Sequence, residues 1–393
     1  MNLTQLLAFT MQNKASDLHL SAGSPPVIRV NGILKRVKAD PLSSDDIRTM
    51  LYSVMTEDQR SEYEKHMDLD FAIALGEKAR FRVNGFTSRL GACGVFRTIP
   101  SEVPTMEQLG LPPIIRRFAE LEKGIILVTG PTGSGKSTTL ASMINHINMN
   151  EPKHILTIED PVEFFHTSKK SLVNHREVGT DTGSFARALK SALREDPDVI
   201  LVGEMRDYET IGLALTAAET GHLVFATLHS SSAAKTIDRL IDVFPTGDKE
   251  MVRAMLASSL QGVVAQTLLS KADGSGRVGA YEVLVGTNAV RNLIRENQIP
   301  QMYSMMQTGS RYGMVTMEEA VTDLLESGLI DKEEARTALL RVSDGDDERD
   351  EGHAAAALGG GKIDPAVAAT RGKASGRADI KGAGASGGEG YSF

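Results

Sequence analysis

The sequence predicts an α/β protein with three parts: an α+β N-terminal domain, a larger domain with a mainly parallel sheet, and a disordered tail. Three observations lead to this prediction. Short apolar runs alternate with helical segments from Gly124 to about Leu269, a pattern typical of parallel strands that are buried on both faces. A mixture of shorter strand and helix patterns precedes them, and large apolar residues almost vanish from Ser343 onward.

The composition limits the class of protein. Of the 393 residues, 41% are hydrophobic and 24% are charged, so the chain can bury a sizeable core. The formal net charge of −8 argues against bulk electrostatic capture of nucleic acid or of an anionic membrane. The single cysteine, Cys93, excludes an intrachain disulfide and a multi-cysteine zinc site. Neither a membrane-spanning run nor a secretory signal is recognisable, and we expect a cytoplasmic protein.

Residues 1–100 are expected to form the N-terminal domain, and residues 101–113, which carry several prolines, are expected to form a linker. Leu3 and Leu7 fall on one face of an opening helix, and residues 45–65 have the pattern of a second helix. The expected strands of this domain are 17–20, 27–30, 70–75, 79–86 and 94–99.

Residues Gly130 to Ser137, GPTGSGKS, match the phosphate-binding loop pattern G-x-x-x-x-G-K-[ST]. An apolar run precedes the loop and a helix-compatible stretch follows it. Glycines let backbone N–H groups turn inward around a phosphate, while Lys136 reaches the terminal phosphates and the Ser137 hydroxyl can bind Mg²⁺. We therefore predict a site for ATP and Mg²⁺. The residues expected to contact the nucleotide are Gly130, Pro131, Thr132, Gly133, Ser134, Gly135, Lys136, Ser137 and Thr138.

Polar residues of unusual character follow the next three predicted strands. The strand expected at residues 154–158 is followed by three carboxylates within the five residues that end at Glu163. The strand at 199–202, VILV, is followed by Glu204, and the strand at 223–228 by His229. Ligands collect where the strands of an open α/β sheet end. Carboxylates there can support Mg²⁺ and orient or deprotonate an attacking water. For His229, two roles stay open: holding a loop by a hydrogen bond, or sensing the terminal phosphate.

With these motifs the sequence resembles the secretion ATPase superfamily, the motors of type II secretion and type IV pili. GPTGSGKS, TIEDPVEF, VILVGEMRD and GHLVFATLH correspond, in that order, to the superfamily's Walker A motif, Asp box, Walker B motif and His box. The match is closer to the pilus retraction ATPases, the PilT branch. It extends from SDLHLSAG near residue 16 to AVRNLIRE at residues 289–296, and covers about residues 1–340.

The resemblance implies a PAS-like N-terminal domain, a RecA-like motor domain at residues 114–342 and a homohexameric ring with ATP between the two domains. It implies that Glu163 is the base for the attacking water and that Glu204 supports Mg²⁺ and the water geometry. Arginines of the N-terminal domain would reach the nucleotide, and Arg82 and Arg97 are the candidates. The alternative for these arginines is a solvated sheet face.

The resemblance favours an ATPase that retracts type IV pili from the cytoplasmic side of the inner membrane. It implies a pilus platform protein and an accessory retraction ATPase as candidate partners, and no nucleic acid. One alternative is a pilus assembly or type II secretion ATPase, but a single cysteine excludes the tetracysteine zinc element usual in those proteins. Another is a nucleotide-bound regulatory subunit without hydrolysis, against which Lys136, Glu163 and Glu204 argue. Nucleic-acid translocation is disfavoured by the net acidity.

Two segments lie outside the nucleotide motifs. In AVRNLIRE, the apolar residues Val290 and Ile294 have the spacing of a helix that packs on a core, whereas the resemblance implies a role in retraction for Arg291 and Arg295. Accessory retraction ATPases lack this element, so its presence favours the principal retraction motor. Residues 343–393 cannot bury enough apolar surface to offset their ordering entropy, and we predict that they are disordered.

Overall fold

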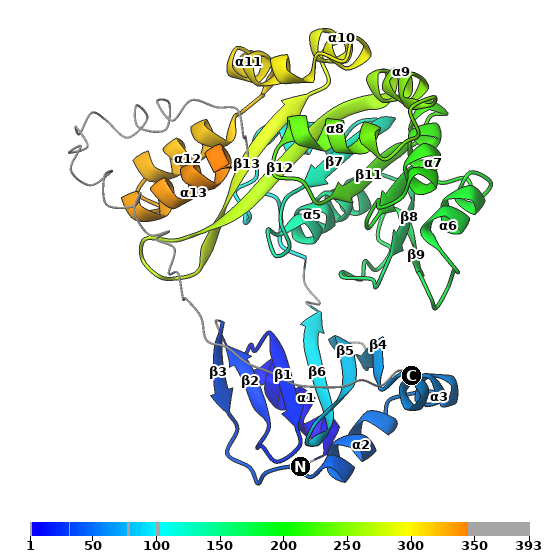
Figure 1. Cartoon of the computed structure of the whole chain (residues 1–393), viewed down its shortest axis with the longest axis vertical. Helices are drawn as coiled ribbons and strands as arrows, with labels where there is room; N and C mark the ends of the chain where they lie inside the picture. The colour runs from blue at the N-terminus through cyan, green and yellow to red at the C-terminus, as the bar shows by residue number, and fades with distance from the viewer. Residues whose placement is uncertain (1, 31, 77–78, 100–102, 345–393) are drawn as a thin grey trace, which may run out of the picture. The chain divides into compact units, whose positions relative to one another are not determined.

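The computed structural model describes residues 2–30, 32–76, 79–99 and 103–344. It contains a six-stranded antiparallel sheet near the N-terminus and a seven-stranded, mainly parallel sheet in the remainder (Figure 1). The predicted α/β class is confirmed. The predicted disordered tail lies outside the described residues from position 345 onward.

The N-terminal sheet has the strand order β3-β2-β1-β6-β5-β4. Its strands are β1 (Asp17–Ser21), β2 (Val27–Val30), β3 (Ile33–Arg36), β4 (Asp68–Leu75), β5 (Ala79–Ser88) and β6 (Gly91–Ile99). Helix α1 (Leu3–Gln12) and helix α2 (Ser44–Tyr52) pack their apolar residues against one face of this sheet. Successive strand residues point to opposite faces, so Phe81 and Val83 are fully buried under the helices while Arg82 lies on the other face.

The helix predicted at residues 45–65 is in fact two helices. Helix α2 ends at Tyr52, and helix α3 (Glu57–His66) begins after a new N-cap, Thr56. The Thr56 side chain accepts a hydrogen bond from the Gln59 amide, and the Gln59 side chain accepts one from the Thr56 amide. This reciprocal capping satisfies two amide groups that a continuous helix would not expose, and it starts the second helix.

The seven-stranded sheet has the strand order β13-β12-β7-β11-β10-β8-β9. Every neighbouring pair is parallel except β12 with β13, which form an antiparallel hairpin at one edge. The strands are β7 (Gly124–Thr129), β8 (His154–Glu159), β9 (Leu172–Glu177), β10 (Val199–Val202), β11 (Leu223–Leu228), β12 (Leu260–Ser270) and β13 (Arg277–Val285). Strand β9 was not predicted, because LVNHRE is an edge strand of mixed polarity without an apolar run.

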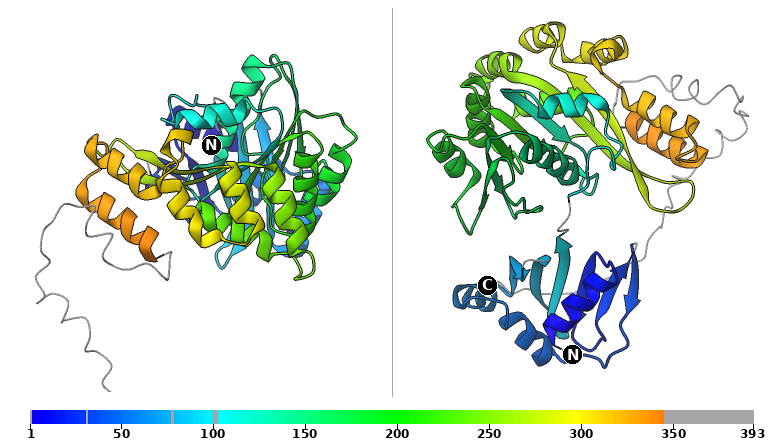
Figure 2. Two further views of the ribbon diagram at one scale, coloured as in Figure 1. Left: turned by 90° about the horizontal axis from the view of Figure 1, so that it is seen from above. Right: turned by 180° about the vertical axis from the view of Figure 1, so that it is seen from behind.

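Helices cover both faces of the seven-stranded sheet (Figure 2). Helices α4 (Pro113–Ala119) and α5 (Lys136–Asn150) pack on one face, and Met106, within the predicted linker, is buried with them. The opposite face is covered by α6 (Phe185–Ala192), α7 (Tyr208–Glu219), α8 (Ala233–Asp242), α9 (Lys249–Ser259), α10 (Asn288–Arg295) and α11 (Met302–Gln307). All residues of β7, β10 and β11 are buried, as expected for strands between two helical layers.

The last two helices, α12 (Met317–Glu326) and α13 (Lys332–Asp344), pack on the β12–β13 hairpin. The capping box predicted at Thr316 and Glu319 is present. At the start of α13, Asp331 accepts a hydrogen bond from the Glu334 amide, while the Glu334 carboxylate accepts one from the Ser270 amide of β12. Within the described ranges, no helix is both long and apolar enough to pass through a bilayer.

Candidate functional site

The phosphate-binding loop connects β7 to α5, and its glycines adopt backbone conformations that other residues rarely reach. Gly130, Gly133 and Gly135 have φ values of 144°, 79° and 91°. A Cβ atom on Gly130 would lie 2.3 Å from the carbonyl oxygen of Gln266 on β12. The loop therefore needs glycine at this position both for its φ angle and for the close approach of β12.

Lys136 is the first residue of α5 and is only 9% exposed. Its Nζ donates hydrogen bonds to the carbonyl oxygens of Gly130, at 2.8 Å, and Pro131, at 3.1 Å. Burial lowers the pKa of Lys136, and the negative charges of Glu204 and Glu163 oppose that shift. The fold thus brings together one lysine and two carboxylates that follow three different strands.

The remaining predicted nucleotide contacts differ in exposure. Ser134 is buried, and its hydroxyl has no hydrogen-bond partner in the described part of the chain. Ser137 and Thr138 are half-buried, whereas Pro131, Thr132 and Gly133 are exposed. The Gln266 side-chain amide donates to the carbonyl oxygen of Ser134 at 2.8 Å. Sequence reasoning missed Gln266, because a lone glutamine in an apolar strand carries no recognisable signal.

Glu204 follows β10, and the side chains of Arg206 and His229 hold its carboxylate. Arg206 lies 2.6 Å from Oε1 and donates to Oε2 at 2.7 Å, and Nε2 of His229 lies 3.0 Å from Oε1. Burial alone would raise the pKa of Glu204, but the hydrogen bonds and charges of Arg206 and His229 outweigh it and lower the pKa. His229 thus contacts this acid directly. The two roles left open for His229 both stay predictions.

Glu163 is exposed and lies in the turn after β8. Its backbone amide donates to Oε2 of Glu159 at 3.2 Å. Glu159 is the last residue of β8 and is 8% exposed. Its burial, helped by the like charges of Glu163 and Glu177, raises its pKa to about 7, although hydrogen bonds from Glu163 and Thr157 oppose the shift. The acid nearest the predicted base therefore titrates near neutral pH.

The two candidate arginines of the N-terminal domain face each other across neighbouring strands. Arg82 on β5 pairs in register with Arg97 on β6. Nε of Arg97 donates to Oδ1 of the buried Asp17 at 3.0 Å, and Arg82 lies 4.0 Å from Asp70. The side chain of Arg97 is 67% exposed. Both arginines therefore lie on the sheet face away from the helices, and each has a carboxylate partner there.

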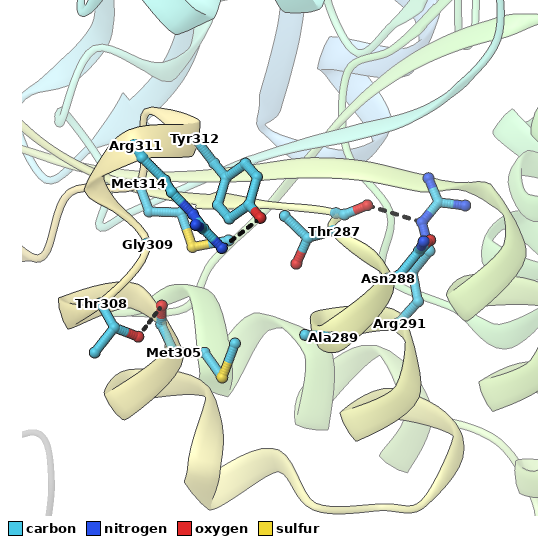
Figure 3. Close-up of a pocket in the computed structure, with 11 residues that line it drawn as sticks. Thr287, Asn288, Ala289, Arg291, Met305, Thr308, Gly309, Arg311, Tyr312 and Met314 are labelled. Atoms are coloured by element: carbon cyan, nitrogen blue, oxygen red, sulfur yellow. Dashed lines mark hydrogen bonds between the residues drawn. The ribbon is translucent and has the colours of Figure 1, made fainter.

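The AVRNLIRE segment forms helix α10, and Val290 and Ile294 are fully buried, as predicted. Arg291 lies beside a cavity of about 540 Å³ (Figure 3). Its guanidinium donates to the carbonyl oxygens of Gly286, Ser258 and Leu260 at 2.8 to 3.0 Å. Arg291 thus ties α10 to the end of α9, a structural role that the sequence does not reveal. Arg295 is exposed, and the roles of Arg291 and Arg295 in retraction stay predictions.

The donor set fits a magnesium nucleotide better than a metal held by protein alone. Across the described ranges, no group of three or more His, Cys, Asp or Glu side chains is placed to hold a metal ion. Mg²⁺ usually keeps several waters and needs only one or two protein ligands together with substrate phosphates. Ser137 and Glu204 are the side chains that would serve, beside a loop with three glycines at positive φ.

Comparison with known proteins places the chain among relatives of similar length. The family described as type II/IV secretion system protein matches residues 2–341. The type IV pilus retractation ATPase PilT of Pseudomonas aeruginosa is 56% identical over 336 residues, which are 86% of this chain and 97% of that protein. The type IV pilus ATPase PilU of the same species is 39% identical over 335 residues, 85% of this chain and 88% of that protein.

A solved structure supports the fold. The crystal structure of the pilus retraction motor PilT with bound ADP matches with a TM-score of 0.80 at 48% identity, and the match covers 86% of this chain and 97% of that one.

The pKa of Glu159 predicts a dependence of stability on pH. Its folded-state pKa of about 7 lies above its ordinary value of 4.5. Burying this residue costs free energy once it is ionised, so the free energy of unfolding falls as pH rises from about 4.5 to about 7. Glu159→Gln, which cannot ionise, should therefore stabilise the protein more at pH 8 than at pH 5, by on the order of 1–3 kcal/mol. Thermal melting measures this, with Glu122→Gln as control, because Glu122 is exposed and is not among the charges that shift the pKa of Glu159. An equal effect at both pH values would contradict the assignment.

Proposed function

The chain belongs to the family of type II/IV secretion system proteins, and from this premise we propose that it is a Mg²⁺-dependent ATPase that powers type IV pilus retraction. The observation that carries the proposal is that Lys136 of the phosphate-binding loop lies within electrostatic reach of Glu163 and Glu204, which follow two neighbouring strands of the sheet. The direction of filament movement rests on the relatives, because the same motif chemistry would serve assembly. The identity of 56% with PilT against 39% with PilU favours the principal motor over the accessory one.

Lys136, Glu163 and Glu204 would perform different parts of the reaction. Lys136 would balance the charge of the terminal phosphates, which the inward-turned loop amides also bind. Exposed Glu163 would orient the attacking water and accept its proton. Glu204, held by Arg206 and His229, would help to hold Mg²⁺ and to set the position of the water. Mg²⁺, when bound, supplies further positive charge to the phosphates.

The working assembly would be a homohexamer, as the resemblance to retraction motors implies. Arg82 and Arg97 would then stabilise negative charge on the nucleotide from the N-terminal domain. The motor would act in the cytoplasm against an inner-membrane platform protein, with an accessory retraction ATPase as a further partner. The register pairing of Arg82 with Arg97, of which Arg82 is half-buried and Arg97 exposed, supports this role for the two arginines.

Lys136→Ala should abolish most ATPase activity, because it removes the cation that balances the terminal phosphates. A strain carrying this variant should still display surface pili but should not withdraw them or show twitching motility. Lys123→Ala, an exposed lysine just before β7, is the matched control and should behave normally. A Lys136→Ala strain without any surface pili would instead identify an assembly motor, and unchanged ATP turnover would refute the site.

Glu163→Gln and Glu204→Gln should lose activity in different ways. Removing the base should lower kcat roughly 10²- to 10⁴-fold while ATP still binds. Glu204→Gln should in addition raise the Mg²⁺ concentration needed for half-maximal activity. Magnesium titrations of ATP hydrolysis compare the two variants with the unmodified protein. Superimposable titration curves for the two variants would show that the division of roles is wrong.

Arg82→Ala or Arg97→Ala should slow hydrolysis roughly 10²-fold or more while leaving nucleotide binding intact, because each removes a charge that stabilises the transition state. Arg29→Ala is the matched control, since Arg29 lies 3.7 Å from Asp17 on the same sheet. ADP affinity and kcat, measured side by side, separate the two effects. Normal kcat in both arginine variants, or full activity from residues 101–342 alone, would remove the N-terminal domain from catalysis.

A further inference from the structure

The turn that carries Glu163 is held by two carboxylates. It follows β8 as irregular backbone, and two consecutive amides in it point at glutamates. The Val162 amide donates to Oε2 of Glu177 at 3.0 Å, and the Glu163 amide donates to Oε2 of Glu159 at 3.2 Å. Val162 is only 8% exposed, so its amide would lose a hydrogen bond that water could not easily replace.

Glu159 and Glu177 reach the turn from neighbouring strands. They are paired in register at the ends of β8 and β9. Two adjacent carboxylates repel each other, and Glu177 is among the charges that raise the pKa of Glu159. The pairing is unfavourable in itself, so it needs a compensating interaction. The two amides of the turn supply that interaction, one for each carboxylate.

The loop after β9 orients Glu177 itself. The Thr180 hydroxyl donates to Oε1 of Glu177 at 3.2 Å, which leaves Oε2 for the Val162 amide. The Glu177 amide donates to Oδ2 of Asp181 at 2.9 Å, and the Asp181 amide donates to the Glu177 carbonyl oxygen at 2.7 Å. The glutamate is thus fixed at both its backbone and its side chain, as a residue that positions another group must be.

We propose that Glu177 is a positioning residue for ATP hydrolysis: by accepting the Val162 amide, it fixes the turn and thereby holds the Glu163 carboxylate in place to activate water. The inference rests on the proposed ATPase function and adds a residue outside its four motifs. Glu177 touches neither the phosphate-binding loop nor Glu204 through any hydrogen bond found among the described residues. Its effect should therefore fall on the chemical step and not on nucleotide binding.

Glu177→Ala removes the acceptor, and kcat should fall roughly 10- to 100-fold, because a displacement of about 1 Å at a catalytic group has this effect. KM and the affinity for a fluorescent ADP should stay near those of the unmodified hexamer. Glu177→Gln keeps an acceptor oxygen and should restore most of kcat. Asp181→Asn is the matched control: it removes one negative charge from the same loop, retains an acceptor for the Glu177 amide, and should behave normally.

A double variant distinguishes positioning from a loss of general stability. If Glu177 acts through Glu163, adding Glu177→Ala to Glu163→Gln should lower kcat no further. Multiplied losses in the double variant would overturn the proposal, as would a normal kcat in Glu177→Ala or an equal loss in Glu177→Gln. If Glu177→Ala does not fold, Glu177→Asp, one methylene shorter, takes its place. An unmodified protein without ATPase activity would refute the proposed function itself, whereas active unmodified protein with normal Glu177 variants refutes only this inference.

Discussion

The burial of the central parallel strands on both faces is the constraint on which the rest of the structure depends. Every residue of β7, β10 and β11 lies between two layers of helices, where an unpaired charge would be costly. Charged groups can therefore occur only where these strands end. Because the strands are parallel, their carboxyl ends meet at one edge, and the residues that follow them are gathered without any need for sequence proximity.

The carboxylates gathered at this edge repel one another, and their charges are compensated to different degrees. Glu204 is compensated by Arg206 and His229, and its pKa is lowered. Within the described part of the chain, Glu159 has no cationic side chain among its hydrogen-bond partners, and it is buried beside two other glutamates, so its pKa rises to about 7. Lys136 is attracted to Glu204 and Glu163 while burial disfavours its charge. A site balanced in this way is suited to accept an anionic ligand together with a divalent cation.

In the N-terminal sheet, burial likewise decides where charged residues can lie, but only one face is buried. Its helices cover one face only, so alternate residues of each strand are free to be polar. Phe81 and Val83 fill the core, and Arg82 shares the open face with Arg97. The alternation was readable from ARFRVN alone. The ion pair of Arg97 with the buried Asp17 was not, because it joins strands that lie about 80 positions apart.

The sequence alone determined the phosphate-binding loop, the order of the four motifs and the apolar periodicity of the buried strands, because each depends on residues close together in the chain. It also indicated most strands and the cap of α12. Only the tertiary structure decided which groups hold the functional side chains. The contact of Val162 with Glu177 exists because the polar strand β9 pairs with β8, and Arg291 is structural because α10 returns to the end of α9. Such contacts join positions far apart in the chain, and no local pattern encodes them.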